Sequence, residues 1–173
     1  VLLIVDGPPT DQEAFIYLDR RRYADGERAR LPRPGTKHVI CEHCRVIELG
    51  WETLSHSGVI ESVWLPKANS IGDSAFRCCT WLARVSLPVF ESIGSYAFKG
   101  CHSLRSVSLI AQELGDGAFA GCSQLRTVSL PYARFASVNL FNCCYQLESV
   151  SMPIATEVRT SSFLSCSSLT EVS

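Results

Sequence analysis

A repeat of about 22 residues runs through most of the chain, and such a period restricts the fold more than any other feature. One Phe recurs at nearly constant intervals, at Phe76, Phe98, Phe119, Phe141 and Phe163. A Cys follows each Phe three positions later, at Cys79, Cys101, Cys122, Cys144 and Cys166. A Leu and then a Val follow at further intervals of three, for example Leu104 and Val107. Such a period predicts a solenoid in which each repeat forms one coil.

Each repeat predicts two short strands and a third segment that is a short helix or a turn. The pattern Leu-x-x-Val-x-Leu alternates apolar and polar residues, as a half-buried strand does. A second apolar stretch ends at residues such as Ile93, and Gly follows it at 72, 94 and 115. The segment Ala97 to Cys101 and its equivalents then return the chain to the next strand. Stacked coils about 4.8 Å apart would pile like residues into columns, so we expect the Phe and Cys residues to form a structural ladder.

The chain divides into two parts. A degenerate copy of the repeat, with Leu54, Ile60 and Val63 in the expected columns, precedes the clear copies. We therefore expect a solenoid over residues 49–173, with one degenerate and five clear repeats, the last one truncated. Residues 1–48 differ in kind and are expected to cap the solenoid, with a buried strand over residues 1–5 and a short helix over residues 12–22. A start without Met and a stop within a repeat suggest a fragment.

The repeat resembles that of the BspA-like leucine-rich-repeat family. Residues 93–109 read Ile-Gly-Ser-Tyr-Ala-Phe-Lys-Gly-Cys-His-Ser-Leu-Arg-Ser-Val-Ser-Leu, and the resemblance extends over residues 49–173. It implies an α/β leucine-rich-repeat solenoid, a right-handed superhelix of such coils, and binding or adhesion at the surfaces of bacteria and protists. The last two coils depart from the pattern, because Ser137 and Arg159 replace the Gly. Arg159 would be strained if this position needed a positive φ, so we expect the backbone to differ locally there.

Charge and motifs narrow the function classes. The net charge is −1, whereas nucleic-acid backbones and anionic membranes demand a basic excess. The longest aliphatic run, Val1 to Val5, is far shorter than the roughly 20 residues that span a bilayer. No nucleophile elbow, phosphate loop or paired-carboxylate motif occurs, so we predict no catalytic residue, no cofactor and no enzymatic activity.

The chain has nine Cys, and their arrangement favours packing over chemistry. We expect the column Cys to be buried thiols that donate weakly to nearby carbonyls, because five parallel side chains cannot all pair. Cys78 and Cys143 are interpreted as substitutions at a small-residue position. The single C-x-x-C at Cys41 and Cys44, with nearby His, leaves a zinc site open as an alternative that we do not predict. Unpaired Cys favour a reducing compartment and the resemblance favours the cell surface, so the location stays open.

The outward positions of the first strand of each repeat form the candidate binding surface. Trp and Arg are enriched at interaction hot spots. The candidate binding residues are Trp64, Arg84, Ser86, Arg105, Ser108, Arg126, Ser129 and Glu148. We predict a non-enzymatic module that presents this face to a protein or glycan partner. Two alternatives remain: a structural spacer in a larger protein, and the regulatory repeat region of an enzyme whose catalytic domain lies elsewhere.

Overall fold

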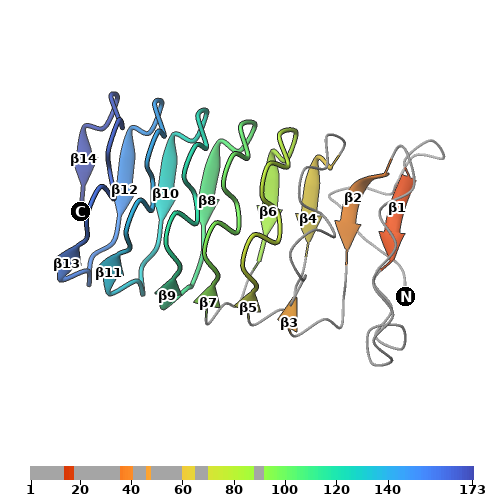
Figure 1. Ribbon diagram of the computed structural model, residues 1–173, viewed down its shortest axis with the longest axis horizontal. Helices are drawn as coiled ribbons and strands as arrows, with labels where there is room; N and C mark the ends of the chain where they lie inside the picture. Colours follow the sequence, from red (N-terminus) through yellow and green to blue (C-terminus); the bar gives the residue numbers. More distant parts are fainter. Residues whose placement is uncertain (1–13, 18–35, 41–45, 48–59, 65–69, 88–91) are drawn as a thin grey trace.

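The protein is a stack of coils in which the strands of successive coils pair in parallel, with one interruption on each of two faces. The computed structural model describes residues 14–17, 36–40, 46–47, 60–64, 70–87 and 92–173, and Figure 1 shows the coils side by side. None of these residues is helical, and the third segment of each coil is a turn, one of the two expected alternatives. The helix expected over residues 12–22 is wrong over its first half, since Ala14–Tyr17 forms strand β1.

One strand from each coil builds the first face. Its strands are β1, β2 (Thr36–Ile40), β4 (Ser62–Trp64), β6 (Arg84–Ser86), β8 (Ser106–Ser108), β10 (Thr127–Ser129), β12 (Ser149–Ser151) and β14 (Glu171–Val172). They pair in the orders β1-β2-β4-β6 and β8-β10-β12-β14, so the ladder is interrupted once, between β6 and β8. The register sets Val128 beside Val107 and Val150, which aligns the inward column. We call the outward surface of β4 to β14 the strand face.

The second face is built from shorter strands. Strands β3 (Val46–Ile47), β5 (Ser70–Ile71), β7 (Ser92–Ile93) and β9 (Glu113–Leu114) form one sheet, and β11 (Phe135–Ala136) and β13 (Glu157–Val158) form another. On the first face, β1 pairs with β2 and β2 with β4, so both lie in the same sheet as the coils that follow them. That residues 1–48 form an N-terminal cap distinct from the solenoid stays a prediction.

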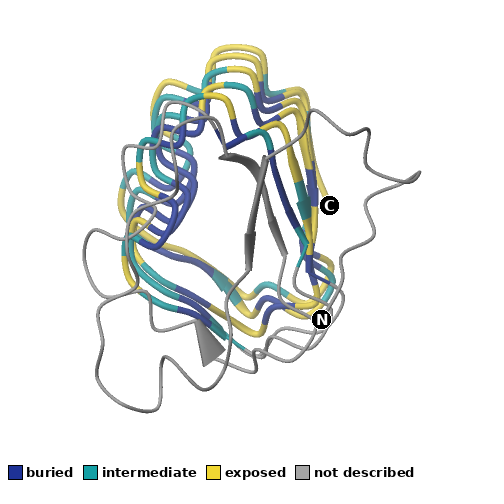
Figure 2. Ribbon diagram, turned by 90° about the vertical axis from the view of Figure 1, so that its right-hand side faces the viewer, coloured by how far each residue is buried: buried dark blue, intermediate teal, exposed yellow. Residues whose placement is uncertain are grey.

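The turns close the third side of each coil, and Figure 2 shows the resulting three-sided cross-section, in which buried residues recur at the same places in successive coils. Backbone hydrogen bonds join neighbouring turns: the Phe98 N–H donates to the Ala118 carbonyl at 2.8 Å and the Gly100 N–H to the Ala120 carbonyl at 2.8 Å. Gly100 has a φ of 75°, in the left-handed region that Gly adopts without strain. Cys78 and Cys143 occupy the equivalent position at φ values of 56° and 61°. This position is therefore defined by backbone conformation as well as by small size.

Two ladders fill the core. The Phe rings stack nearly parallel, with centroids 5.4 Å apart for Phe76–Phe98 and for Phe98–Phe119. Column thiols donate to a Phe carbonyl of the preceding coil, as Cys122 Sγ does to the Phe98 oxygen at 3.2 Å. Burial raises the pKa of the Cys122 thiol to about 12, so the thiol stays protonated and keeps its donor. The ladders recur because every coil repeats the same local geometry.

The glycine column after the second strand reflects close packing and not a positive φ. A Cβ added at Gly115 would lie 2.3 Å from the Ser95 nitrogen, and Gly94 and Gly115 do not have positive φ values. The Gly115 N–H donates to the Ile93 carbonyl at 2.7 Å, which continues the ladder from coil to coil. The strain considered for Arg159 therefore does not arise from φ at this position.

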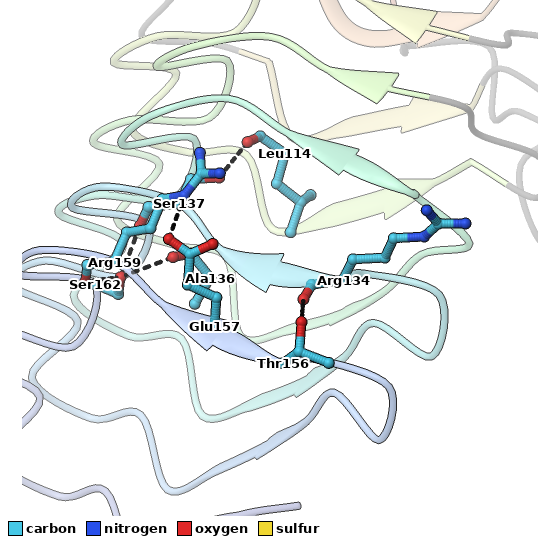
Figure 3. Close-up of polar contacts among 8 residues, drawn as sticks. All are labelled: Leu114, Arg134, Ala136, Ser137, Thr156, Glu157, Arg159 and Ser162. Carbon is cyan, nitrogen blue, oxygen red and sulfur yellow. Dashed lines mark hydrogen bonds and ion pairs between the residues drawn. The ribbon is translucent and has the colours of Figure 1, made fainter.

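The backbone differs locally where Ser137 replaces Gly, whereas the hydrogen bond at Arg159 is the regular one, so the difference expected in the last two coils holds only for the first of them. Strands β9 and β11 are not paired, and the Ser137 Oγ donates to the Leu114 carbonyl, the acceptor at this step (Figure 3). One coil later the Arg159 N–H donates to the Ala136 carbonyl at 2.9 Å. At Ser137 the side-chain hydroxyl thus takes the place of the backbone N–H as the donor to the carbonyl of the preceding coil. This change makes room for the Ser137 Cβ.

Candidate functional site

The strand face brings the sequence-predicted binding residues onto one surface. Parallel pairing in register places the residues that flank each central Val in two straight outward columns. The exposed members of the predicted set are Arg84, Ser86, Arg105, Ser108, Arg126 and Glu148. Trp64 and Ser129 are half-buried. The prediction that Trp64 heads the surface therefore overstates how much of this ring is accessible.

Trp81 is a residue that the sequence reasoning missed. It precedes the buried Leu82 and is 61% exposed, more than Tyr96, Tyr132 or Tyr145. The equivalent residues of the following coils are polar, namely Ser103, Gln124, Gln146 and Ser168. A single Trp in an otherwise polar outward column is the signal that would have identified it. It lies three positions before Arg84, next to the first strand of the same coil.

The charges of the strand face are unevenly paired. Arg126 Nη1 lies 2.5 Å from Glu148 Oε1, and the two side chains are 54% and 48% exposed. Such an exposed pair contributes about 0–1 kcal/mol to stability. Arg84 and Arg105 have no ion-pair partner among the residues that the structure describes. Both guanidinium groups are exposed and available to an acidic group on a partner.

An apolar stripe borders the strand face just beyond the carboxyl ends of β8, β10 and β12. It consists of Ile110, Tyr132 and Ile154, which are 46%, 50% and 48% exposed. Tyr132 and Ile154 lie one full repeat apart in the sequence and therefore occupy the same place in successive coils. Large apolar side chains repeated at one exposed position are more typical of a contact surface than a single exposed residue is.

The second face carries a shallow groove of about 530 Å³ along the glycine column. Its lining runs over five coils and includes Asp73, Gly94 and Glu113 from the first three of them. Phe135 and Arg159 line one end, where the guanidinium stacks on the ring at 4.0 Å from its centroid. Arg159 Nε also lies 3.1 Å from Glu157 Oε1 (Figure 3). The groove thus ends where Phe135 takes the position of Ser92 and Glu113, and where Arg159 takes that of the column glycines.

The described residues contain no group of three or more His, Cys, Asp or Glu that could hold a metal ion. His102 is exposed, and its Nδ1 lies 3.3 Å from Ser123 Oγ. Cys41 and Cys44, the zinc alternative, lie outside the described residues. Over the same described part of the chain, no helix has the length and apolar character needed to cross a membrane.

Stacked parallel coils with a polar outer face define a leucine-rich-repeat solenoid, the fold of repeat modules for protein interaction. The family model of the BspA-type leucine-rich repeat region matches residues 47–170 of this chain as six copies. The chain therefore belongs to this family. The expected resemblance and the expected fold are thereby confirmed.

Solved structures of bacterial leucine-rich proteins share the fold. A leucine-rich cell surface protein of Faecalibacterium prausnitzii is 21% identical, with a TM-score of 0.59 over 94% of this chain and 48% of its own. The leucine-rich repeat protein of T. pallidum is 22% identical, with a TM-score of 0.57 over 92% of this chain and 79% of its own. A leucine-rich repeat protein of Bacteroides ovatus is 18% identical, with a TM-score of 0.54 over 96% of this chain and 47% of its own.

This chain thus spans about half the length of the Faecalibacterium and Bacteroides proteins. At these identities the similarity shows the fold alone. No curated protein sequence matches the chain.

Proposed function

We propose that the chain is a non-enzymatic binding module whose strand face contacts a protein partner. The observation that carries the proposal is the group formed by the exposed Trp81 and the two exposed arginines Arg84 and Arg105, which have no ion-pair partner among the described residues. Trp and Arg supply most of the binding energy at many protein interfaces, because they combine a large contact area with directed hydrogen bonds. A rigid stack holds these side chains in place before binding, which lowers the entropy cost of association.

The surface around this group is flat and therefore suits a protein partner better than a small ligand. The outward positions of β8, β10 and β12 are occupied by Ser and Thr, whose short side chains leave the face level. A small molecule needs a concave site that covers most of its surface. A broad, level, polar face with a few large side chains is the arrangement found at protein interfaces.

A pull-down with a matched control tests the proposal. The variant Trp81→Ala/Arg84→Ala/Arg105→Ala, used as bait in an extract of the cells that produce the protein, is expected to lose the captured partner. The control Tyr96→Ala/Arg77→Ala/Lys99→Ala also removes one aromatic ring and two cations, but from the turn side, and should capture it normally. Unchanged capture by the first variant would reject the strand face and favour a structural spacer.

We also propose that this module works at the cell surface. The Faecalibacterium protein with the same fold is a cell surface protein by name. The cysteines of the core do not oppose this location, because Cys101, Cys122 and Cys144 are buried and inaccessible thiols resist oxidation. Labelling of intact cells with an antibody against the solenoid tests the location, and a signal seen only after permeabilisation would reject it.

A further inference from the structure

We propose that the strand face pairs with the strand face of a second copy of this chain, in an antiparallel dimer with its two-fold axis along β10. This inference rests on the proposed function, because it names the partner of the same face. Two features of the described residues support it independently: the order of the charges along the face and the position of the apolar stripe.

The exposed charges of the strand face change sign along the solenoid. Arg84 and Arg105 lie on the side toward β6, and Glu148 and Glu171 lie on the side toward β14. Arg126 lies between them and is paired with Glu148. The half-buried Glu61, next to β4, lies beyond the basic end. A face that is positive at one end and negative at the other is complementary to itself when reversed.

The register makes this match specific. Arg105 and Glu148 occupy the same outward column, one coil before and one coil after Arg126. Arg84 and Glu171 share the neighbouring column, two coils before and two coils after β10. The stack continues across the interruption between β6 and β8, because the Phe76 N–H donates to the Ala97 carbonyl at 2.8 Å. A half-turn about an axis along β10 therefore sets Arg105 opposite the second copy's Glu148 and Arg84 opposite the second copy's Glu171.

The same half-turn also aligns the apolar stripe. The axis runs along the strands, so the side of the face beyond their carboxyl ends meets the same side of the second copy. Tyr132 follows β10 and would meet its own equivalent, while Ile110 would meet the second copy's Ile154. These side chains are about half exposed in the single chain, and the dimer would cover them. One rotation thus matches Arg84 and Arg105 with the two glutamates and aligns the apolar side chains, while Arg126, at the axis, faces its own equivalent and keeps Glu148 of its own chain as partner.

The size of the face predicts how tight this dimer is. The five strands β6 to β14 that carry these charges, at about 4.8 Å spacing, extend over roughly 20 Å, which is short of the dimensions of a standard interface of about 800 Å² per partner. Exposed ion pairs add about 0.2–1 kcal/mol each and are screened by salt. We therefore expect a weak, salt-sensitive dimer, formed at high micromolar concentration or where many copies are held close together.

Charge reversal tests the pairing. Sedimentation velocity of the unchanged chain, up to about 1 mM, should show a dimer that weakens at least tenfold when NaCl is raised to about 0.5 M. Arg84→Glu/Arg105→Glu makes the face acidic and Glu148→Arg/Glu171→Arg makes it basic, so each variant alone should be monomeric. An equimolar mixture of the two should associate, because opposite charges then face each other at residues 84, 105, 148 and 171, while Arg126 is the same in both variants.

The control variant Arg77→Glu/Lys99→Glu makes the same charge change on the turn side and should dimerise normally. An unchanged chain that stays monomeric at low salt, or a mixture that fails to associate, would overturn the dimer. If the chain is monomeric but the Trp81 triple variant loses a captured protein, the dimer is wrong and the proposed function stands. If the chain is monomeric and capture is unchanged, both are wrong.

Discussion

Replacing Phe119 by Ala tests whether the Phe ladder holds the coils together. Phe119 is 1% exposed and stacks on Phe98 at 5.4 Å and on Phe141 at 5.8 Å. Truncation of a buried Phe to Ala costs about 3–5 kcal/mol, through lost transfer free energy and the cavity that remains. Aromatic stacking contributes about 0.5–1.5 kcal/mol per pair beyond buried area, and two pairs are lost here. We therefore expect the free energy of unfolding to fall by about 5 kcal/mol.

Phe163 provides the internal comparison. It is half-buried and stacks on Phe141 at 5.6 Å, with no other ring partner among the described residues. Because less area and only one stacked pair are lost, Phe163→Ala should cost about 2 kcal/mol. Phe119→Leu keeps most of the volume and should cost roughly 1.5 kcal/mol.

Urea unfolding followed by far-UV circular dichroism measures these differences. Since repeat arrays can unfold in steps, the transitions should also be followed by Trp fluorescence, and a single free energy is assigned only where the two probes coincide. Equal losses at residues 119 and 163, or a loss below about 2 kcal/mol for Phe119→Ala, would refute the nearest-neighbour account of the ladder.

Three further predictions follow from the core. Ser137→Ala should lower the free energy of unfolding by about 1–3 kcal/mol in urea titrations, because the Leu114 carbonyl loses the hydroxyl that donates to it. Gly94→Ala should lower the melting temperature more than Gly100→Ala does, although only Gly100 has a positive φ. The reason is that a Cβ at residue 94 would lie 2.5 Å from the backbone of the preceding coil. A larger fall for Gly100→Ala would contradict this. The melting temperature should fall as the pH rises from about 9 toward 12. The thiol of Cys122 ionises near pH 9 in the unfolded chain, whereas its pKa in the folded chain is about 12. Deprotonation in this range therefore favours the unfolded state. Cys122→Ser keeps a donor without this ionisation and should show a smaller fall.

Most of the fold could be predicted because the repeat period is itself structural information. When Phe98 and Phe119 recur one repeat apart, with Cys and Leu at constant offsets, each coil must offer the same face to its neighbour. Local pattern was less dependable outside the repeat. The sequence around Ala14–Tyr17 predicts a helix, but this stretch pairs in parallel with β2, and such pairing overrides a weak local preference.

The candidate site could be predicted only in outline. Alternation along the strands identified the outward columns, so Arg84 and Arg105 were named correctly as exposed. The exposure of Trp64 was overestimated and Trp81 was overlooked. A side chain's accessibility depends on which residues of the neighbouring coils cover it, and spacing along one coil does not contain that information.

The amino-acid sequence alone determined the coil length, the residues that share a column and the polar character of the strand face, because all three follow from periodicity. The tertiary structure decided what depends on distances between coils. It made the third segment a turn and required Gly94 and Gly115 because the preceding backbone lies too close for a Cβ. It also let the Ser137 hydroxyl replace a backbone donor, and it paired Arg126 with Glu148 while leaving Arg105 without an ion-pair partner among the described residues. These features arise between atoms that are one repeat apart in the chain and in contact only once the coils have stacked.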